Sequence, residues 1–242
     1  MTSTRVDGLD NRSGTPGRFA GQRAVITGGT SGLGLALVKA LRRGGAEVAF
    51  IARDEERVAS VTRETGAVGI VGDVAKKEDI HRIAIEVGAS VGRSGAIDLL
   101  VNNASSLGPV PLRPLGDTDC EDLEAALATN LVGPFRLTKV LLGPLAKAAR
   151  EGRSSVVLNV SSDAAKNAYA GWGAYGASKA ALAHLSAIWG EELAASGVRV
   201  LAMDPGDMDT PLHELALPGS DRAALKRPED AARELLAAVA EA

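Results

Sequence analysis

The sequence predicts an α/β protein built on a doubly wound parallel β-sheet, with about six strands and helices on both faces. Short apolar runs alternate with longer helical patterns, and turn-forming residues lie at the ends of the runs. Most of the runs read as nearly continuous apolar stretches, which is typical of strands that are buried on both faces of a parallel sheet. Parallel strands need helical crossovers, and these are right-handed.

The elements follow one another along the chain. We expect strands over residues 23–26, 47–51, 67–71, 97–101, 155–160 and 198–203, and helices over 33–43, 55–64, 77–91, 120–150, 174–195 and 228–240. Gly133, Pro134, Gly143 and Pro144 predict kinks or ends within the long fourth helix. No repeat or composition break divides the chain, so we expect one domain over 18–242 after a mobile tail, 1–17.

Composition narrows the class of protein. The chain has 242 residues, 45% of them hydrophobic, which is enough for a sizeable core. Its formal charge is -3, with no basic excess, and Phe 3, Trp 2 and Tyr 2 offer few stacking platforms, so nucleic acid is disfavoured as a partner. One cysteine and three scattered histidines disfavour disulfides and a metal site. Without a signal peptide or an apolar membrane span, we expect a cytoplasmic protein that has no membrane partner.

A glycine-rich turn follows the first predicted strand. Residues 27–34 read Thr-Gly-Gly-Thr-Ser-Gly-Leu-Gly and lead into a helix. Glycine permits φ > 0 and a close approach of the backbone to a ligand, and the helix N-terminus offers free N–H groups, so this turn can hold a pyrophosphate. A turn that binds nothing is the alternative. Leu35 stands where a nucleoside triphosphatase would have lysine, which disfavours that class.

Tyr175 and Lys179 form the second candidate feature. They lie four residues apart on the predicted helix 174–195, so they share one face. A tyrosine has a pKa of about 10, and a nearby ammonium favours the phenolate, so this pair can exchange protons near neutral pH. Tyr175 is the candidate general acid/base. A chance pair of surface residues is the alternative.

Together these motifs resemble the short-chain dehydrogenase/reductase family. The turn has the family's TGxxxGxG spacing, and Ser162 lies thirteen residues before Tyr175, where the family carries a serine at the end of strand five. Further resemblances follow in order: Asp73-Val74, Asn102-Asn103-Ala104, Asn130, and Asp204-Pro205-Gly206 with Thr210. The resemblance covers about residues 23–211 and implies a Rossmann-type sheet that binds a dinucleotide.

The resemblance also implies roles for these residues. The implied reaction is hydride transfer between a nicotinamide and a carbonyl or alcohol carbon of a small molecule. In it Tyr175 moves the proton, and Lys179 holds the ribose and tunes Tyr175. Ser162 orients the substrate, and Asn130 completes a proton relay. The implied cofactor-binding residues are Gly28, Thr30, Ser31, Gly32, Leu33, Gly34, Arg53, Asp73, Val74, Asn102, Ala104, Tyr175, Lys179, Pro205, Gly206, Met208 and Thr210.

The end of the second strand indicates which nicotinamide cofactor binds. Ala52 stands where relatives that prefer NAD usually carry aspartate, and Arg53 follows it. An arginine suits a 2′-phosphate, so we expect NADP(H). Asp54 could instead serve NAD(H) or pair with Arg53, so NAD(H) stays open.

Two other functions and the assembly remain open. A dinucleotide sensor would keep the fold without turnover, and a serine hydrolase would pair Ser162 with His184 or His213, although no GxSxG motif occurs. The family's seventh strand is expected to be missing, which disfavours a tetramer, and we expect a homodimer through the long fourth and fifth helices, where Ala180, Ala181 and Ala187 allow close approach. Substrate choice is expected from residues 105–114, 164–172 and 210–227, with few helical residues in the last segment and Trp172 as a wall.

Overall fold

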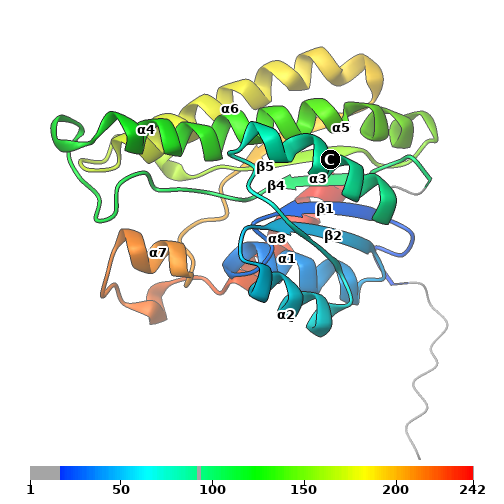
Figure 1. Ribbon diagram of the computed structural model, residues 1–242, viewed down its shortest axis with the longest axis horizontal. Coiled ribbons are helices and arrows are strands. Elements are labelled where there is room, and N and C mark those ends of the chain that lie inside the picture. Colours follow the sequence, from blue (N-terminus) through cyan, green and yellow to red (C-terminus); the bar gives the residue numbers. More distant parts are fainter. Residues whose placement is uncertain (1–16, 92–93, 242) are drawn as a thin grey trace, which may run out of the picture.

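The six strands form one parallel sheet. The computed structural model describes residues 17–91 and 94–241, so the expected tail lies outside the described residues except for Gly17. The strands are β1 (Arg23–Thr27), β2 (Glu47–Ala52), β3 (Val68–Val71), β4 (Leu99–Asn102), β5 (Val156–Val160) and β6 (Arg199–Met203), in the spatial order β3-β2-β1-β4-β5-β6 (Figure 1). The predicted fold class is confirmed. Because the strand order reverses between β1 and β4, their carboxyl ends flank a crevice of the kind that binds ligands.

The inner strands of the sheet are mostly apolar on both faces, whereas the edge strands β3 and β6 are only partly buried. All five residues of β5 are buried, and in β2 only Glu47 is exposed. Phe50 of β2 pairs with Ile26 of β1 in the parallel register. Burial of both faces removes the usual alternation, as a parallel sheet covered by helices requires.

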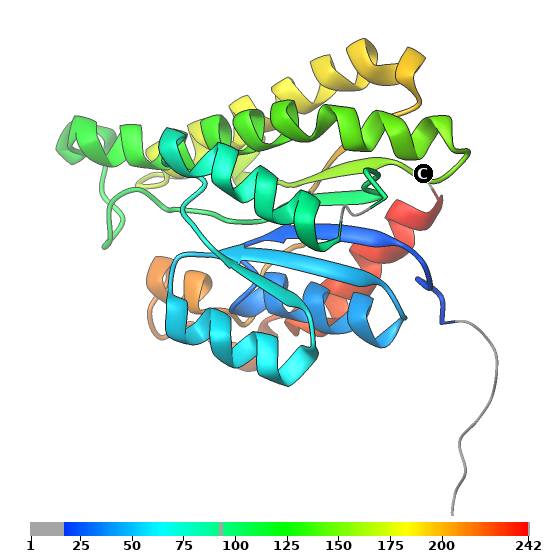
Figure 2. The same ribbon diagram turned by 45° about the vertical axis from the view of Figure 1, so that its right-hand side comes forward.

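Helices cover the sheet on both sides. The described α-helices are α1 (Gly32–Arg43), α2 (Glu55–Thr65), α3 (Lys77–Ser90), α4 (Cys120–Leu127), α5 (Gly133–Arg150), α6 (Gly173–Leu193), α7 (Pro211–Ala216) and α8 (Pro228–Glu241). Figure 2 shows α1, α2 and α8 on one side of the sheet and α3, α5 and α6 on the other. In the described part of the chain, no helix is long and apolar enough to cross a membrane.

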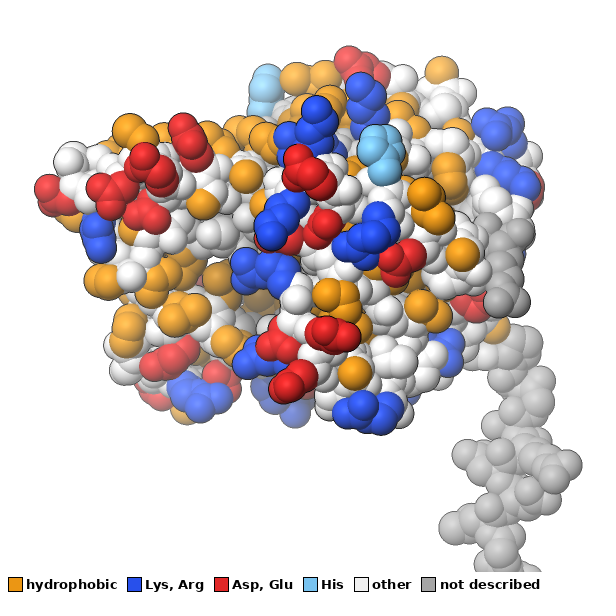
Figure 3. Space-filling model, viewed as in Figure 1, with side chains coloured by type: hydrophobic (Ala, Val, Ile, Leu, Met, Phe, Trp, Pro, Cys, Tyr) orange, Lys and Arg blue, Asp and Glu red, His pale blue; other side chains and the backbone are white. Residues whose placement is uncertain are grey.

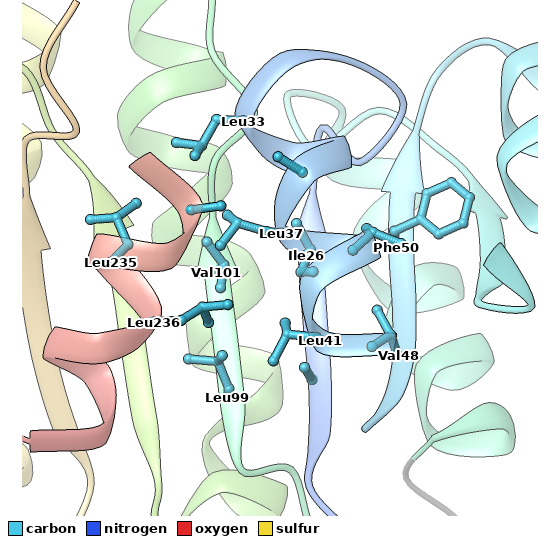
Figure 4. Close-up of a cluster of buried hydrophobic side chains, with 14 of the residues drawn as sticks. Ile26, Leu33, Leu37, Leu41, Val48, Phe50, Leu99, Val101, Leu235 and Leu236 are labelled. Atoms are coloured by element: carbon cyan, nitrogen blue, oxygen red, sulfur yellow. The ribbon is translucent and has the colours of Figure 1, made fainter. Parts of the chain in front are cut away.

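The core on the α1 and α8 side anchors the glycine-rich turn. Leu37 and Leu41 of α1 pack with Leu235 and Leu236 of α8 against side chains of β1, β2 and β4 (Figure 4). All four leucines are at most 3% exposed. Burial of such a side chain is worth about 1.5–3 kcal/mol, so the start of α1 is held firmly against the sheet.

The structure breaks the predicted helix 120–150 at one place. α4 and α5 are separated by a π-helical turn, Ala128–Val132, directly before Gly133 and Pro134. Pro134 has no N–H with which to continue the helical pattern, so a break was expected there. Pro144, in contrast, lies inside α5 and does not end it.

The segment 210–227 is more helical than expected. Pro211 begins α7 instead of limiting it, because proline is well accommodated in the first turn of a helix. Thr210 caps this helix by accepting a hydrogen bond from the backbone N–H of His213 at 3.2 Å. A short 3-10 helix, Arg222–Ala224, follows.

Candidate active site

Loops from different strands meet at the carboxyl edge of the sheet. A Cβ on Gly28, after β1, would lie 3.1 Å from the Cα of Ala104, after β4. A Cβ on Gly32 would lie 3.0 Å from Cγ2 of Thr210, after β6. The structure thus brings together three of the motifs that the sequence keeps far apart.

The turn after β1 has the geometry of a phosphate cradle. Gly28 and Gly32 have φ of 70° and 48°, a region that disfavours side chains. A Cβ on Gly34 would fall 2.1 Å from the carbonyl oxygen of Gly28, so only glycine fits there. Ser31 is the N-cap of α1 but makes no side-chain cap hydrogen bond. The first N–H groups of α1 therefore suit an anion such as a pyrophosphate, and the residues present fit a dinucleotide.

Asn103 and Thr27 hold this turn, and the sequence reasoning did not assign either of them. Nδ2 of Asn103 donates to the carbonyl oxygens of Thr27 at 2.9 Å and Gly28 at 3.3 Å, and its backbone N–H donates to Oγ1 of Thr27 at 2.9 Å. Asn102, which the resemblance placed among the cofactor contacts, has a buried amide that donates to Thr138 of α5 and to Asn159 of β5. The doubled asparagine was the available signal, but the sequence does not say which side chain faces the turn.

Tyr175 and Lys179 lie on one face of α6, as predicted. Nζ of Lys179 is 5.5 Å from the centre of the Tyr175 ring and donates to the carbonyl oxygen of Val160 at 2.8 Å. Burial lowers the pKa of Lys179 to about 8. The expected lowering of the Tyr175 pKa is wrong for this structure: burial raises it, and the Ser162 and Ser105 hydroxyls only oppose that rise. The phenol is therefore protonated at neutral pH.

Ser162 follows β5 and lies beside Tyr175. Its hydroxyl donates to Oδ1 of Asp163 at 3.2 Å and accepts from the backbone N–H of Ala164 at 3.2 Å. The other oxygen of Asp163 accepts a hydrogen bond from the Tyr169 hydroxyl at 2.7 Å, and this bond lowers the pKa of Asp163. Asp163 and Tyr169 were not predicted, because their contact depends on the path of the loop.

The two histidines of the hydrolase alternative have other surroundings. Nδ1 of His213 is 3.3 Å from the Ser220 hydroxyl, and His184 is exposed on α6. Among the described residues, no histidine is hydrogen-bonded to Ser162. The described residues therefore place no histidine where it could act as the general base for this serine.

Asn130 lies in the π-helical turn and is buried. Its Oδ1 accepts from the Ser105 hydroxyl at 3.2 Å and the Ser106 backbone at 2.8 Å, while its Nδ2 donates to the Ser106 carbonyl at 2.7 Å and the Ser178 hydroxyl at 2.8 Å. These four bonds use the whole capacity of the amide. The backbone carbonyl has no α-helical partner, because Pro134 lacks an N–H. Any relay water would therefore be held by this carbonyl and not by the side chain.

The candidate residues for the adenosine end lie after β2 and β3. Arg53 is exposed and has no ion-pair partner within the described ranges. Asp54 caps α2 by accepting a hydrogen bond from the Arg57 backbone at 3.0 Å, and its carboxylate lies 3.5 Å from Nε of Arg57. Asp73 receives the backbone N–H of Ala75, and Val74 is buried.

The loop after β6 is fastened at its base. Pro205 is buried, and Gly206 has φ of 76°. Met208 pairs with Lys226 in an isolated parallel bridge, and Nζ of Lys226 donates to the carbonyl oxygen of Pro205 at 3.2 Å. The loop that begins with Pro205 therefore returns to its own start, with α7 between.

The fold and the site define a dinucleotide-type α/β protein with a tyrosine–lysine pair, and comparisons give its family. A profile of the short chain dehydrogenases matches residues 22–219. The chain therefore belongs to the short-chain dehydrogenase/reductase family of oxidoreductases.

Similar proteins include enzymes of different specificity. The chain is 37% identical to a protein named ketoacyl reductase 1 of the granaticin polyketide synthase from Streptomyces violaceoruber, over 83% of this chain and 72% of that protein. It is 33% identical to L-fucose dehydrogenase from Bos taurus, over 81% and 70%. Among solved structures, 3-ketoacyl-(acyl-carrier-protein) reductase from Brucella melitensis with NADH has a TM-score of 0.82 at 27% identity and 90% coverage of both chains. An Escherichia coli CFT073 relative with NADPH has a TM-score of 0.80 at 26% identity and 91% coverage of both.

Proposed function

We propose that this protein is an NADP(H)-dependent oxidoreductase that interconverts a carbonyl group and a secondary alcohol on a small molecule. One observation carries the proposal: a protonated phenol, Tyr175, lies beside a hydroxyl, Ser162, and a buried amine, Lys179, at the edge of the sheet where the glycine-rich turn lies. A sensor that only binds a dinucleotide would not need this proton donor.

In the proposed reduction each side chain has one task. The chemistry that a reduced nicotinamide would supply here is a hydride for the carbonyl carbon. Tyr175 gives its phenolic proton to the carbonyl oxygen. The Ser162 hydroxyl turns away from Asp163 and donates its one hydrogen bond to the same oxygen as negative charge develops there. Lys179 holds the ribose hydroxyls, and its partner, the Val160 carbonyl, fixes the direction of the amine. A water at the Asn130 backbone carbonyl returns a proton toward Tyr175.

The charges at the end of β2 support NADP(H) over NAD(H). A 2′-phosphate needs a cation that is free to pair with it, and Arg53 meets this need. The carboxylate that would compete, Asp54, is committed to the N-cap of α2. Solved relatives exist with NADH and with NADPH, so the relatives do not decide the preference, and Arg53 is the residue of this chain that supports NADP(H).

The Arg53→Ala variant tests the cofactor proposal. We expect its KM for NADPH to rise about tenfold or more, because the variant loses a charge-assisted bond worth about 1.5–3 kcal/mol. The KM for NADH should change little. Steady-state kinetics with both cofactors would show this, and equal effects on NADPH and NADH would contradict the assignment of Arg53.

Deuterium transfer tests the reaction itself. The protein is supplied with NADPH deuterated at C4 and an uncharged ketone, and the product alcohol is analysed by mass spectrometry. We expect deuterium on the carbinol carbon, since that carbon receives the hydride. Binding of NADPH without any alcohol from a panel of ketones would instead identify a sensor.

A further inference from the structure

Three segments that are distant in sequence surround the Tyr175 end of α6. We call residues 105–124, 162–172 and 204–227 the site rim. They meet in one apolar cluster formed by Leu107, Ala164, Tyr175 and Ala216, with Leu112, Trp172 and Leu212 packed against it. The Trp172 ring lies edge-on to the Tyr175 ring at 5.7 Å. The three shorter segments that were expected to set substrate choice, 105–114, 164–172 and 210–227, lie within the site rim, and each contributes apolar side chains beside the proton donor.

The outer part of the site rim is apolar as well. Ten large hydrophobic residues are exposed on the described surface, and five of them belong to the site rim: Val110, Leu115, Tyr169, Leu215 and Leu217. Leu115 is 66% exposed and Leu215 is 51% exposed. Exposed apolar side chains that gather around one site indicate a ligand or partner with an apolar surface.

The charges of the site rim are mostly negative. Its segments hold eleven Asp and Glu but only five Lys and Arg, a net charge of −6 in a chain whose total is -3. Four of those five cations are in ion pairs: Arg113 with Asp119, Arg222 with Asp209, Lys226 with Glu234 and Arg227 with Asp230. Figure 3 shows carboxylates over α4 and near α7, with hydrophobic side chains between them.

The carboxylates of the site rim act on the phenolic oxygen of Tyr175. Asp204 and Asp163, both in the site rim, add to the rise of the Tyr175 pKa that burial causes. Lys179 is the facing cation, and its ammonium is bound to the Val160 carbonyl. A substrate that carried several negative charges would be repelled here, whereas an uncharged one would not.

We propose, on the basis of the function proposed above, that the substrate is an uncharged, apolar ketone or secondary alcohol that arrives as a free small molecule. An anionic thioester, such as an acyl group on coenzyme A, does not match the charge of the site rim. A free sugar does not match its apolar side chains, because a sugar's hydroxyls need polar partners.

The first test compares three substrates at saturating NADPH or NADP⁺. We expect kcat/KM for 2-decalone, an uncharged bicyclic ketone, to exceed that for acetoacetyl-coenzyme A and that for L-fucose by about tenfold or more. The kcat/KM of the thioester should rise between about 10 mM and 0.5 M salt, because salt screens repulsion, while that of the ketone stays level. Preference for the thioester at low salt, or for the sugar, would overturn the proposal.

The second test removes charge from the site rim. Glu121 and Glu124 are exposed on α4, and the double variant Glu121→Gln, Glu124→Gln should raise the ratio of kcat/KM for thioester over ketone. The matched control is Glu191→Gln with Glu192→Gln, two exposed carboxylates near the other end of α6, which should leave that ratio unchanged. An equal change in both pairs would overturn the role of the site rim.

The third test makes the lining polar. Leu212→Ser should lower kcat/KM for 2-decalone about tenfold more than kcat/KM for acetone, because only the larger ketone reaches the apolar wall. An unchanged Kd for NADPH shows that the variant is folded. If no carbonyl compound is reduced although NADPH binds, the proposed function fails. If the thioester is reduced best, the function stands and the substrate class fails.

Discussion

Lys179 is 2% exposed, and it is the one lysine among the described residues whose pKa is clearly moved by burial. A buried ammonium costs free energy, and the Val160 carbonyl compensates only part of it. In the proposed function, this cost is kept because the amine must lie one helical turn from Tyr175. We therefore infer that Lys179 is held in place for function and not for stability.

The pH dependence of stability should reveal this cost. The pKa of Lys179 is about 8 in the folded protein and 10.5 when exposed, so between these values the unfolded chain binds more protons and stability rises with pH. Relative to Lys179→Met, the wild type should gain on the order of 3 kcal/mol of unfolding free energy over that range. Urea denaturation at several pH values measures it, and parallel curves for the two proteins would refute it.

For single residues, the sequence predicts the intervals between site residues better than it predicts the surroundings of each side chain. The interval from Tyr175 to Lys179 and the thirteen residues back to Ser162 are properties of the chain, and the structure brings these residues together. Contacts across the sheet decide whether Asn102 or Asn103 faces the turn. The sequence also does not show that burial raises the Tyr175 pKa.

The residues of the glycine-rich turn pack closely against one another, so a change at one position affects the whole turn. In Gly34→Ala the new methyl group would meet the Gly28 carbonyl at 2.1 Å and Asn103 Nδ2 at 2.6 Å, so the backbone of the turn must move. We expect the affinity for NADPH to fall at least about tenfold and the free energy of unfolding to fall by about 1–3 kcal/mol.

A matched alanine substitution shows that the position decides the effect. Gly88 lies in α3, where a Cβ would meet nothing within 4 Å. Gly88→Ala should leave NADPH binding unchanged and add up to about 1 kcal/mol of stability. Fluorescence titration with NADPH and urea denaturation measure both variants. The account of the turn is wrong if Gly34→Ala binds NADPH as the wild type does.

Elements are predictable where local chemistry decides them. The six strands, and the helix break before Gly133 and Pro134, follow from apolar runs and from the missing proline N–H. α7 was missed because Pro211 was interpreted as a limit to helix, whereas the Thr210 cap makes it a start. Two copies of the chain were expected to pair through the predicted helices 120–150 and 174–195, and this stays a prediction.

At the scale of the whole molecule, the sheet order explains why sequence-distant motifs share one site. Loops after β1, β4 and β6 contact each other because their strands are parallel and end at the same edge. The formal charge of -3 does not predict a concentration of negative charge around the site, since the negative segments of the site rim come together only after folding. The fold was therefore predictable from the chain alone, while the charge around the site was not.

The central claim is that Tyr175 moves the proton in a site whose cofactor contacts lie elsewhere in the fold. The most direct measurement is Tyr175→Phe, which removes only the phenolic oxygen, assayed for turnover with NADPH and an uncharged ketone and for NADPH binding by fluorescence. We predict a loss of kcat of about 10²–10⁴-fold with a Kd for NADPH close to that of the wild type. A variant that turns over as fast as the wild type would contradict the account.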